Sequence, residues 1–162
     1  MKQLRLQNGS VALVDDEDYE ELSKFKWYAD QRSRSCYIRR LERNNTPEGP
    51  RQRCVYLHRQ IMQPPPGMDV DHINSDATDN RRENLRICTR SQNNQNARRR
   101  VDSNQSYKGV WITQNGKYAS RIYDGGKKVH IGVYDNEVSA AEAYDRKAKE
   151  LFGAYAKLNF EQ

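Results

Sequence analysis

The chain has 162 residues, of which 35% are hydrophobic and 31% are charged, so it lacks the apolar material for one large core. The net charge of +6 favours a polyanionic partner. The basic excess is local, because residues 31–60 carry 8 basic and 2 acidic groups whereas residues 1–30 carry 4 and 7. Three cysteines without a close pair argue against a disulfide framework and a thiolate zinc site. Since no apolar run resembles a signal peptide or a membrane span, we expect a cytoplasmic protein with no membrane partner.

Residues 1–62 are predicted to form a β-rich region. Alternating apolar residues on both sides of Asn8-Gly9 predict a hairpin, and a short helix is expected over 15–23. Two further strands are expected over 36–41 and 53–57, with a polar loop rich in proline and glycine between them. Alternation in the first of these strands leaves basic side chains available on an outer face. The candidate DNA contacts in this region are Arg39 and Arg40.

Residues 63–100 are predicted to form a second unit, which begins at a breaker run of three prolines and a glycine. Strands are expected over 68–72 and 85–89, and a polar helix should follow, started by the capping box of Thr89 and Gln92. The helix ends in three arginines, which we expect to hold the phosphate backbone of DNA, namely Arg98, Arg99 and Arg100.

After a linker over 101–105, residues 106–160 are predicted to form three strands and one helix. The strands are expected over 109–113, 117–123 and 128–133, with glycine-containing turns between them. The helix should run from about Asp135 to Phe152, where a glycine follows to end it, and its alanines would let it lie close to a sheet. The whole chain is therefore expected to be α+β.

One pair of residues carries the chemistry of phosphodiester hydrolysis, which needs an activated water and a cation that stabilises the leaving oxygen. Asp71 and His72 place a carboxylate and an imidazole side by side at a strand end. A bend at that point would turn both side chains toward one site. Histidine titrates near neutrality and so can accept the proton of the water, and the carboxylate suits Mg²⁺ or Mn²⁺.

The sequence around this pair resembles the HNH endonucleases of the phage and intron homing type. The matching text is Val70-Asp71-His72-Ile73, Asn84-Leu85-Arg86 and Ser91-Gln92-Asn93-Asn94, and residues 1–62 resemble the leader of the same subgroup. The resemblance implies a strand–strand–helix metal finger (ββα), Mg²⁺ or Mn²⁺ as cofactor, no small-molecule cofactor, and a gene carried by a phage or intron in a bacterial host.

The resemblance also implies a role for each matching residue. His72 would be the general base, Asn84 would orient its ring, and Asp71 and Asn93 would be the metal ligands. Many relatives carry histidine where this chain has Asn93, so the metal site would be an Asp/Asn variant, and Asn94 is the nearest rival for the role of Asn93. For His58 we favour a packing role between the N-terminal sheet and the finger.

Residues 106–160 resemble the apetala/ethylene-response-factor (AP2/ERF) domain of plant proteins. The matching text includes Tyr107-Lys108-Gly109-Val110, Gly116-Lys117-Tyr118 and Ala140-Ala141-Glu142-Ala143-Tyr144-Asp145. The resemblance implies that the three-stranded sheet lies in the major groove of double-stranded DNA, although the base preference does not carry over. Lys128 could equally be an ordinary solvated lysine. The DNA-facing residues implied by position are Lys108, Trp111, Thr113, Arg121, Tyr123, Lys128 and His130.

Two functions follow from these patterns. The first is a site-specific, homing-type DNA endonuclease, expected to nick as a monomer because each chain has one finger. The second is a sequence-specific DNA-binding regulator whose finger is no longer catalytic. The hypothesis of an RNA-binding module has less support, because no motif of stacking aromatic residues is present.

Overall fold

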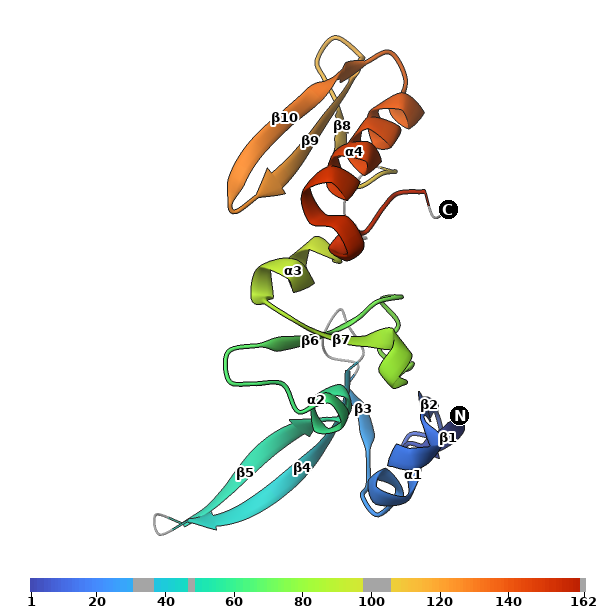
Figure 1. The fold of residues 1–162 in the computed structure, drawn as a ribbon, viewed down its shortest axis with the longest axis vertical. Coiled ribbons are helices and arrows are strands. Elements are labelled where there is room, and N and C mark those ends of the chain that lie inside the picture. The colour runs from blue at the N-terminus through green and yellow to red at the C-terminus, as the bar shows by residue number, and fades with distance from the viewer. Residues whose placement is uncertain (31–36, 47–48, 98–105, 161–162) are drawn as a thin grey trace. The chain divides into compact units, whose positions relative to one another are not determined.

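The computed structural model describes residues 1–30, 37–46, 49–97 and 106–160, and the chain divides into two units, Met1–Thr89 and Arg90–Gln162 (Figure 1). Small antiparallel sheets and a few helices make up both units, so the expected mixture of helices and strands is confirmed. Several predictions concern positions outside the described residues, namely the first residue of the strand expected over 36–41, the three arginines Arg98, Arg99 and Arg100, and the linker 101–105.

The first unit begins with the predicted hairpin. Strand β1 (Lys2–Arg5) pairs antiparallel with β2 (Val11–Val14), and Gly9 between them has φ +85°, which favours glycine. Helix α1 (Asp16–Ser23) follows directly, close to its predicted range.

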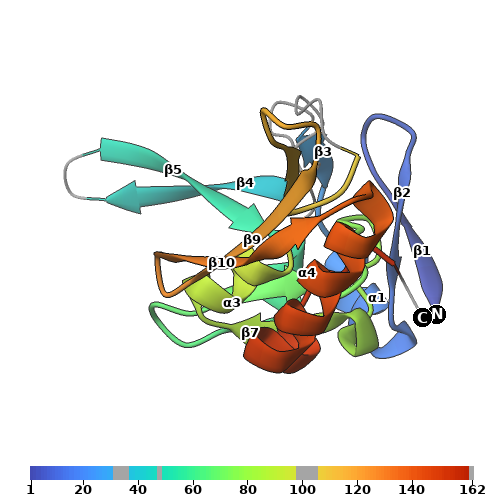
Figure 2. The same cartoon turned by 90° about the horizontal axis from the view of Figure 1, so that it is seen from above.

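A second sheet has the order β3-β4-β5, in which β3 (Tyr28–Asp30) was not predicted. Strands β4 (Tyr37–Thr46) and β5 (Gly49–Tyr56) are longer than expected and extend as a ribbon (Figures 1 and 2). The polar loop expected between the two strands was wrong for Gly49 and Pro50, because the strands pair as far as Thr46 and Gly49, whereas Pro47 lies outside the described residues.

Residue Leu57 was predicted to end a strand but instead begins helix α2 (Leu57–Met62). Leu57 and Ile61 are four residues apart, the spacing of one helical face, and both are buried in the core of the first unit. Gln63 ends the helix in the left-handed conformation, with φ 45°, just before the three prolines.

The predicted strand pair is present as β6 (Asp69–His72) and β7 (Leu85–Cys88), and a short 3₁₀ turn, η1 (Arg82–Asn84), lies directly before β7. Val70 and Leu85 join these strands to a core that also receives side chains from the N-terminal hairpin, α1, β4 and α2. The other members of that core are Leu4, Leu6, Ala12, Val14, Leu22, Trp27, Ile38, Leu57 and Ile61.

The second unit contains α3 (Arg90–Gln95), then β8 (Val110–Ile112), β9 (Tyr118–Asp124) and β10 (Lys127–Tyr134), then α4 (Glu137–Phe152) and the turn η2 (Gly153–Tyr155). The three strands form one antiparallel sheet with β9 in the middle, and α4 lies along one face of it (Figure 2).

Helix α4 begins two residues later than predicted. Its N-cap is Asn136, whose side-chain oxygen accepts a hydrogen bond from Ser139 N at 2.8 Å, so Asp135 lies outside the helix. Gly153 ends the helix with φ +52°, as expected.

The alanines of α4 allow the close contact with the sheet that the sequence predicted. Ala140 and Ala141 are fully buried and pack against Val110 of β8. At Gly109, which precedes β8 with φ +77°, a Cβ atom would lie only 2.2 Å from the ring of Tyr144. Within the described ranges, the helices are all too short or too polar to cross a lipid bilayer.

Candidate active site

The candidate catalytic pair lies at the end of β6. Asp71 and His72 are both buried, with 6% and 5% of their surface exposed. Asp71 faces Arg86 across the ladder with β7, and His72 faces Leu85. Neighbouring strand residues point to opposite faces, and the two side chains accordingly contact different partners.

The ring of His72 is held by Asn80, a residue that the sequence did not single out. His72 Nε2 lies 3.3 Å from Asn80 Oδ1, and Asn80 is only 1% exposed. Burial lowers the pKa of His72, although the hydrogen bond to Asn80 acts in the opposite direction. The neutral imidazole that a general base requires is therefore favoured at neutral pH.

The contact to His72 that was predicted for Asn84 is thus made by Asn80. Asn84 instead organises the loop of residues 73–84 that joins β6 to β7, called here the finger loop. Its Oδ1 accepts a hydrogen bond from Asn74 N at 3.0 Å, and its Nδ2 donates to Asp79 O at 2.8 Å. Its Nδ2 also donates to Asn74 Oδ1 at 3.0 Å, so these hydrogen bonds of the amide are all to the loop itself, and its effect on His72 is indirect.

A cluster of aromatic rings packs against His72. The His58 ring centroid lies 5.2 Å from that of His72 at an interplanar angle of 71°, and Tyr37 and Tyr56 pack against His58. His58 is 6% exposed, and burial together with the neighbouring His72 lowers its pKa to about 3. His58 therefore stays neutral and lies between the β4–β5 sheet and β6, the place expected for a packing role.

Asp71 is paired with a cation. Arg86 Nε and Nη2 both donate to Asp71 Oδ2, at 2.9 and 2.7 Å, and both side chains are largely buried. No group of three or more His, Cys, Asp and Glu side chains is arranged to hold a metal within the described part of the chain. One carboxylate and one amide oxygen still fit Mg²⁺, which commonly takes one or two carboxylates and keeps several waters.

The second candidate ligand, Asn93, lies on α3 together with its rival Asn94. Helix α3 belongs to the second unit, whereas Asp71 belongs to the first. The pairing of Asp71 with Asn93 therefore stays a prediction.

The finger loop is attached to the N-terminal hairpin, a connection that sequence reasoning missed. Leu13 N donates to Thr78 O and Asn80 N donates to Leu13 O, both at 2.8 Å, so β2 holds the loop on its edge. Arg82 adds a backbone bond to Asp15 Oδ2 at 2.8 Å and an ion pair with Asp18 at 2.7 Å. The acidic run at 15–18 and Arg82 were the available signal, but the sequence does not pair them.

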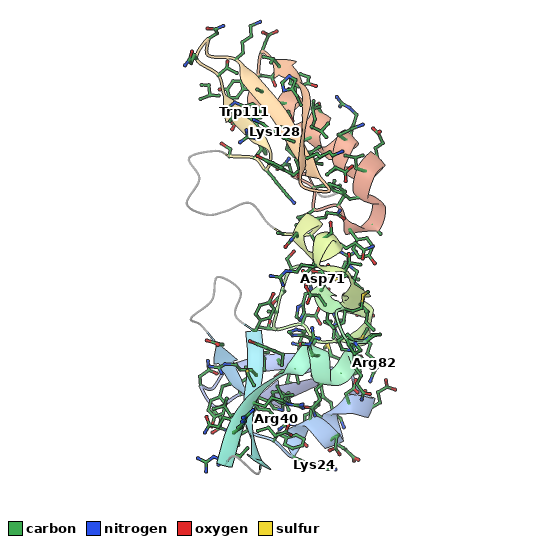
Figure 3. The ribbon with its side chains drawn as sticks, turned by 90° about the vertical axis from the view of Figure 1, so that its left-hand side faces the viewer. Lys24, Arg40, Asp71, Arg82, Trp111 and Lys128 are labelled. Carbon is green, nitrogen blue, oxygen red and sulfur yellow. The ribbon has the colours of Figure 1, made fainter. Side chains whose placement is uncertain are left out.

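The two arginines predicted to contact DNA in the first unit are largely structural. The Arg40 guanidinium lies 4.2 Å from the ring centroid of Phe25 and donates to Gln60 and Glu42, and only 13% of its side chain is exposed (Figure 3). Arg39 pairs with Asp30 at 2.8 Å. The alternation placed Arg40 on an outer face, but α2 and the loop before β3 cover that face.

The sheet of the second unit presents an aromatic and basic outer face, opposite α4. The Arg121 guanidinium lies 4.5 Å from the ring centroid of Trp111 and 5.8 Å from that of Tyr123, so it is stacked between them. Across the β9–β10 ladder, His130 lies opposite Arg121 and Lys128 lies opposite Tyr123. Trp111 and Lys128 are labelled on this sheet in Figure 3. These five predicted DNA contacts therefore come from one face of one sheet.

The remaining two predicted contacts have other roles. Lys108 Nζ donates to Gln95 O at the end of α3 at 2.8 Å, and burial lowers the pKa of Lys108 to about 8. The ammonium of Lys108 is thus partly buried and bonded to a carbonyl, and its predicted place facing DNA stays a prediction. The Thr113 hydroxyl donates to Lys117 O at 2.9 Å and closes the β8–β9 hairpin.

Comparison with known proteins gives two kinds of similarity. Residues 55–95 match the model of the HNH endonuclease family. The chain is 29% identical over 157 residues to an uncharacterised HNH endonuclease of Acanthamoeba polyphaga mimivirus, covering 93% of this chain and 75% of that protein. Over 55 residues, a third of the chain, it is 42% identical to an AP2-like ethylene-responsive transcription factor of Arabidopsis thaliana and to APETALA2-like protein 2 of Oryza sativa. These 55 residues span only 11% and 13% of the plant proteins. The site at His72 thus lies in a region that matches the HNH endonucleases, which supports a nuclease.

Proposed function

We propose that the protein is a site-specific DNA endonuclease of the homing type, encoded by a phage or an intron, which nicks one strand as a monomer. The observation that carries the proposal is the buried imidazole of His72, held by Asn80 inside the region that matches the HNH endonucleases. A positioned, neutral histidine is the group needed to take a proton from the attacking water.

The chain's own residues divide the work as follows. His72 accepts the proton, while Asn80 and the rings around His58 hold its imidazole in place. The oxygens of Asp71 and of Asn93, or its neighbour Asn94, would hold Mg²⁺ or Mn²⁺, which stabilises charge on the scissile phosphate when bound. Arg86 orients the Asp71 carboxylate through its two hydrogen bonds.

The test is direct. The protein is incubated with phage and host genomic DNA in the presence of Mg²⁺, and strand breaks are followed on denaturing and native gels. We expect breaks at a small number of positions, in one strand only, which stop when EDTA is added. Binding without breaks at any Mg²⁺ or Mn²⁺ concentration would contradict the proposal.

One observation favours the alternative, a DNA-binding regulator with a non-catalytic finger. The ion pair with Arg86 already neutralises the Asp71 carboxylate without a metal. In that case the same incubation would give stable complexes with DNA and no strand breaks, whatever divalent ion is supplied.

Exchanging Asp71 for asparagine (Asp71→Asn) tests the proposed metal ligand. We expect a lower cleavage rate and a higher Mg²⁺ concentration for half-maximal activity, because an ionic oxygen ligand is replaced by a neutral one. Asp69→Asn is the matched control, since Asp69 is on the same strand and pairs with Arg59 at 3.7 Å. If both variants and the parent protein show the same Mg²⁺ dependence of cleavage, Asp71 is not a metal ligand.

The second unit is proposed to read the target sequence. Arg121→Ala should relax preference at one or two base pairs and weaken binding to the preferred site by about 1–3 kcal/mol. The preferred site is first obtained by selection from a random duplex library. Lys147→Ala, which removes one positive charge from α4 and so from the opposite side of the sheet, is the control for net charge. If both variants lose equal affinity for selected and random duplexes, Arg121 contacts only phosphates.

A further inference from the structure

Asn80 makes a set of hydrogen bonds that fixes the direction of its side-chain amide. Its Nδ2 donates to Ala77 O at 2.9 Å, and its Oδ1 lies 3.3 Å from His72 Nε2. A carbonyl oxygen only accepts, so the atom facing Ala77 must be the NH₂ group. Turning the amide round would place two oxygens against each other in a site that is 1% exposed. The atom presented to His72 is therefore an acceptor.

An acceptor facing Nε2 determines where the proton of the neutral imidazole lies. One ring nitrogen of neutral histidine carries hydrogen and the other carries the lone pair, and the partner of one nitrogen selects the tautomer. We propose that Asn80 is the positioning residue of the candidate base, holding His72 as the Nε2–H tautomer so that Nδ1 is the atom that accepts the proton of water. This inference deepens the proposed nuclease function and rests on it for its catalytic meaning.

The position of Asn80 is itself set by residues far away in the chain. Its backbone N–H donates to Leu13 O on β2, and Leu13 N donates to Thr78 O, so the hairpin holds the finger loop on both sides of Asp79. Arg82 continues the attachment through Asp15 and Asp18. The N-terminal hairpin therefore supports the active site, because its hydrogen bonds fix the backbone of Asn80, the residue that orients the base.

The ring cluster holds His72 from the other side. His58 meets the His72 ring edge-on, and the Tyr37 ring centroid lies 6.5 Å from that of His72. Rotating the imidazole by half a turn about the Cβ–Cγ bond would exchange Nε2 with Cε1, so a carbon atom would face Asn80 Oδ1 and the hydrogen bond would be lost. The geometry thus keeps both the tautomer and the ring orientation.

The tautomer is measured on the full-length protein by NMR of isotope-labelled histidine, at an alkaline pH where the ring is neutral. The chain has three histidines, so the signals can be assigned with single variants. We expect a protonated Nε2 and an unprotonated Nδ1 in His72 of the parent protein. A protonated Nδ1 would overturn the inference whether or not the protein cuts DNA. If His72 has the expected tautomer but the protein cuts no DNA, the proposed function is overturned. The inference that Asn80 positions the His72 ring would still be supported.

Variants separate Asn80 from Asn84, the residue that the resemblance assigned to this task. Asn80→Ala should give a mixture of tautomers and lower kcat at least tenfold with unchanged DNA affinity, since a wrong tautomer costs about 10⁴-fold in the serine protease triad. Asn80→Asp keeps an acceptor toward Nε2 but loses the donor to Ala77 O, so it should keep the Nε2–H tautomer and recover only part of kcat. If Asn84→Ala changes the tautomer and Asn80→Ala does not, the positioning residue is Asn84 and the inference fails.

Discussion

Replacing His72 with alanine is expected to abolish DNA cleavage while DNA affinity stays within a few-fold of the parent. Loss of a general base typically costs about a hundredfold or more in rate. The side chain is 5% exposed and packs against Asn80, His58 and Tyr37 of the first unit, so its removal takes away little surface that DNA could contact. Single-turnover cleavage and equilibrium binding, measured on the same duplex, separate the two effects.

Chemical rescue distinguishes a lost base from a disturbed fold. Truncation at His72 leaves a cavity lined by the rings of His58 and Tyr37, and free imidazole added to the buffer should restore part of the rate. An alanine variant that cuts within a few-fold of the parent without added imidazole would show that another group takes the proton.

The second large effect concerns the stability of the DNA-reading unit. Gly109→Ala should destabilise the second unit by about 2–4 kcal/mol, which combines about 1 kcal/mol for a left-handed backbone with about 1–3 kcal/mol for overpacking. At φ +77° the new Cβ would lie 2.2 Å from Tyr144 Cδ2 and 2.6 Å from Arg121 O. Neither atom can move aside freely, because Tyr144 is a buried residue of α4 and Arg121 O belongs to the central strand.

Gly126→Ala is the matched control, since Gly126 has φ +81° and a Cβ atom added there would meet nothing within 4 Å. Gly126→Ala should lower the stability of the second unit only by the cost of placing alanine in a left-handed backbone conformation, about 1 kcal/mol. Hydrogen exchange followed by mass spectrometry measures both variants, and peptides from β6 and β7 in the first unit report on general effects. If the amides of β9 lose protection from hydrogen exchange to a similar extent in the two variants, the contact of the new Cβ with Tyr144 does not contribute to the destabilisation.

The parts of the fold that could be predicted are those set by local patterns. The Asn8-Gly9 turn, the strand pair around Asp71 and the alanine face of α4 follow from periodicities within a few residues, and each is present. Helix α2 was missed because its apolar spacing at Leu57 and Ile61 also fits a continuation of the preceding strand. Short apolar runs do not distinguish the two.

The parts of the site that could not be predicted depend on contacts between distant segments. Asn80 carries no local signal, because its importance comes from a backbone bond to Leu13 and from the position of His72. Arg40 and Lys108 have the residue type of a DNA contact, but α2 and α3 supply their partners, Gln60 and Gln95. A basic side chain shows what it could bind, whereas its burial is a property of the assembled fold.

The attachment of the finger loop to β2 also has a consequence for the order in which the first unit folds. The loop and its support are remote in sequence, and Arg82 pairs with Asp18 across 64 residues. Closing so long a segment carries an entropic cost that only the finished core repays, so this contact should form late in refolding. During synthesis the hairpin leaves the ribosome before the finger loop, so the edge of β2 is available when the loop emerges. Residues 55–95 alone would lack that edge, and with it the catalytic alignment of His72.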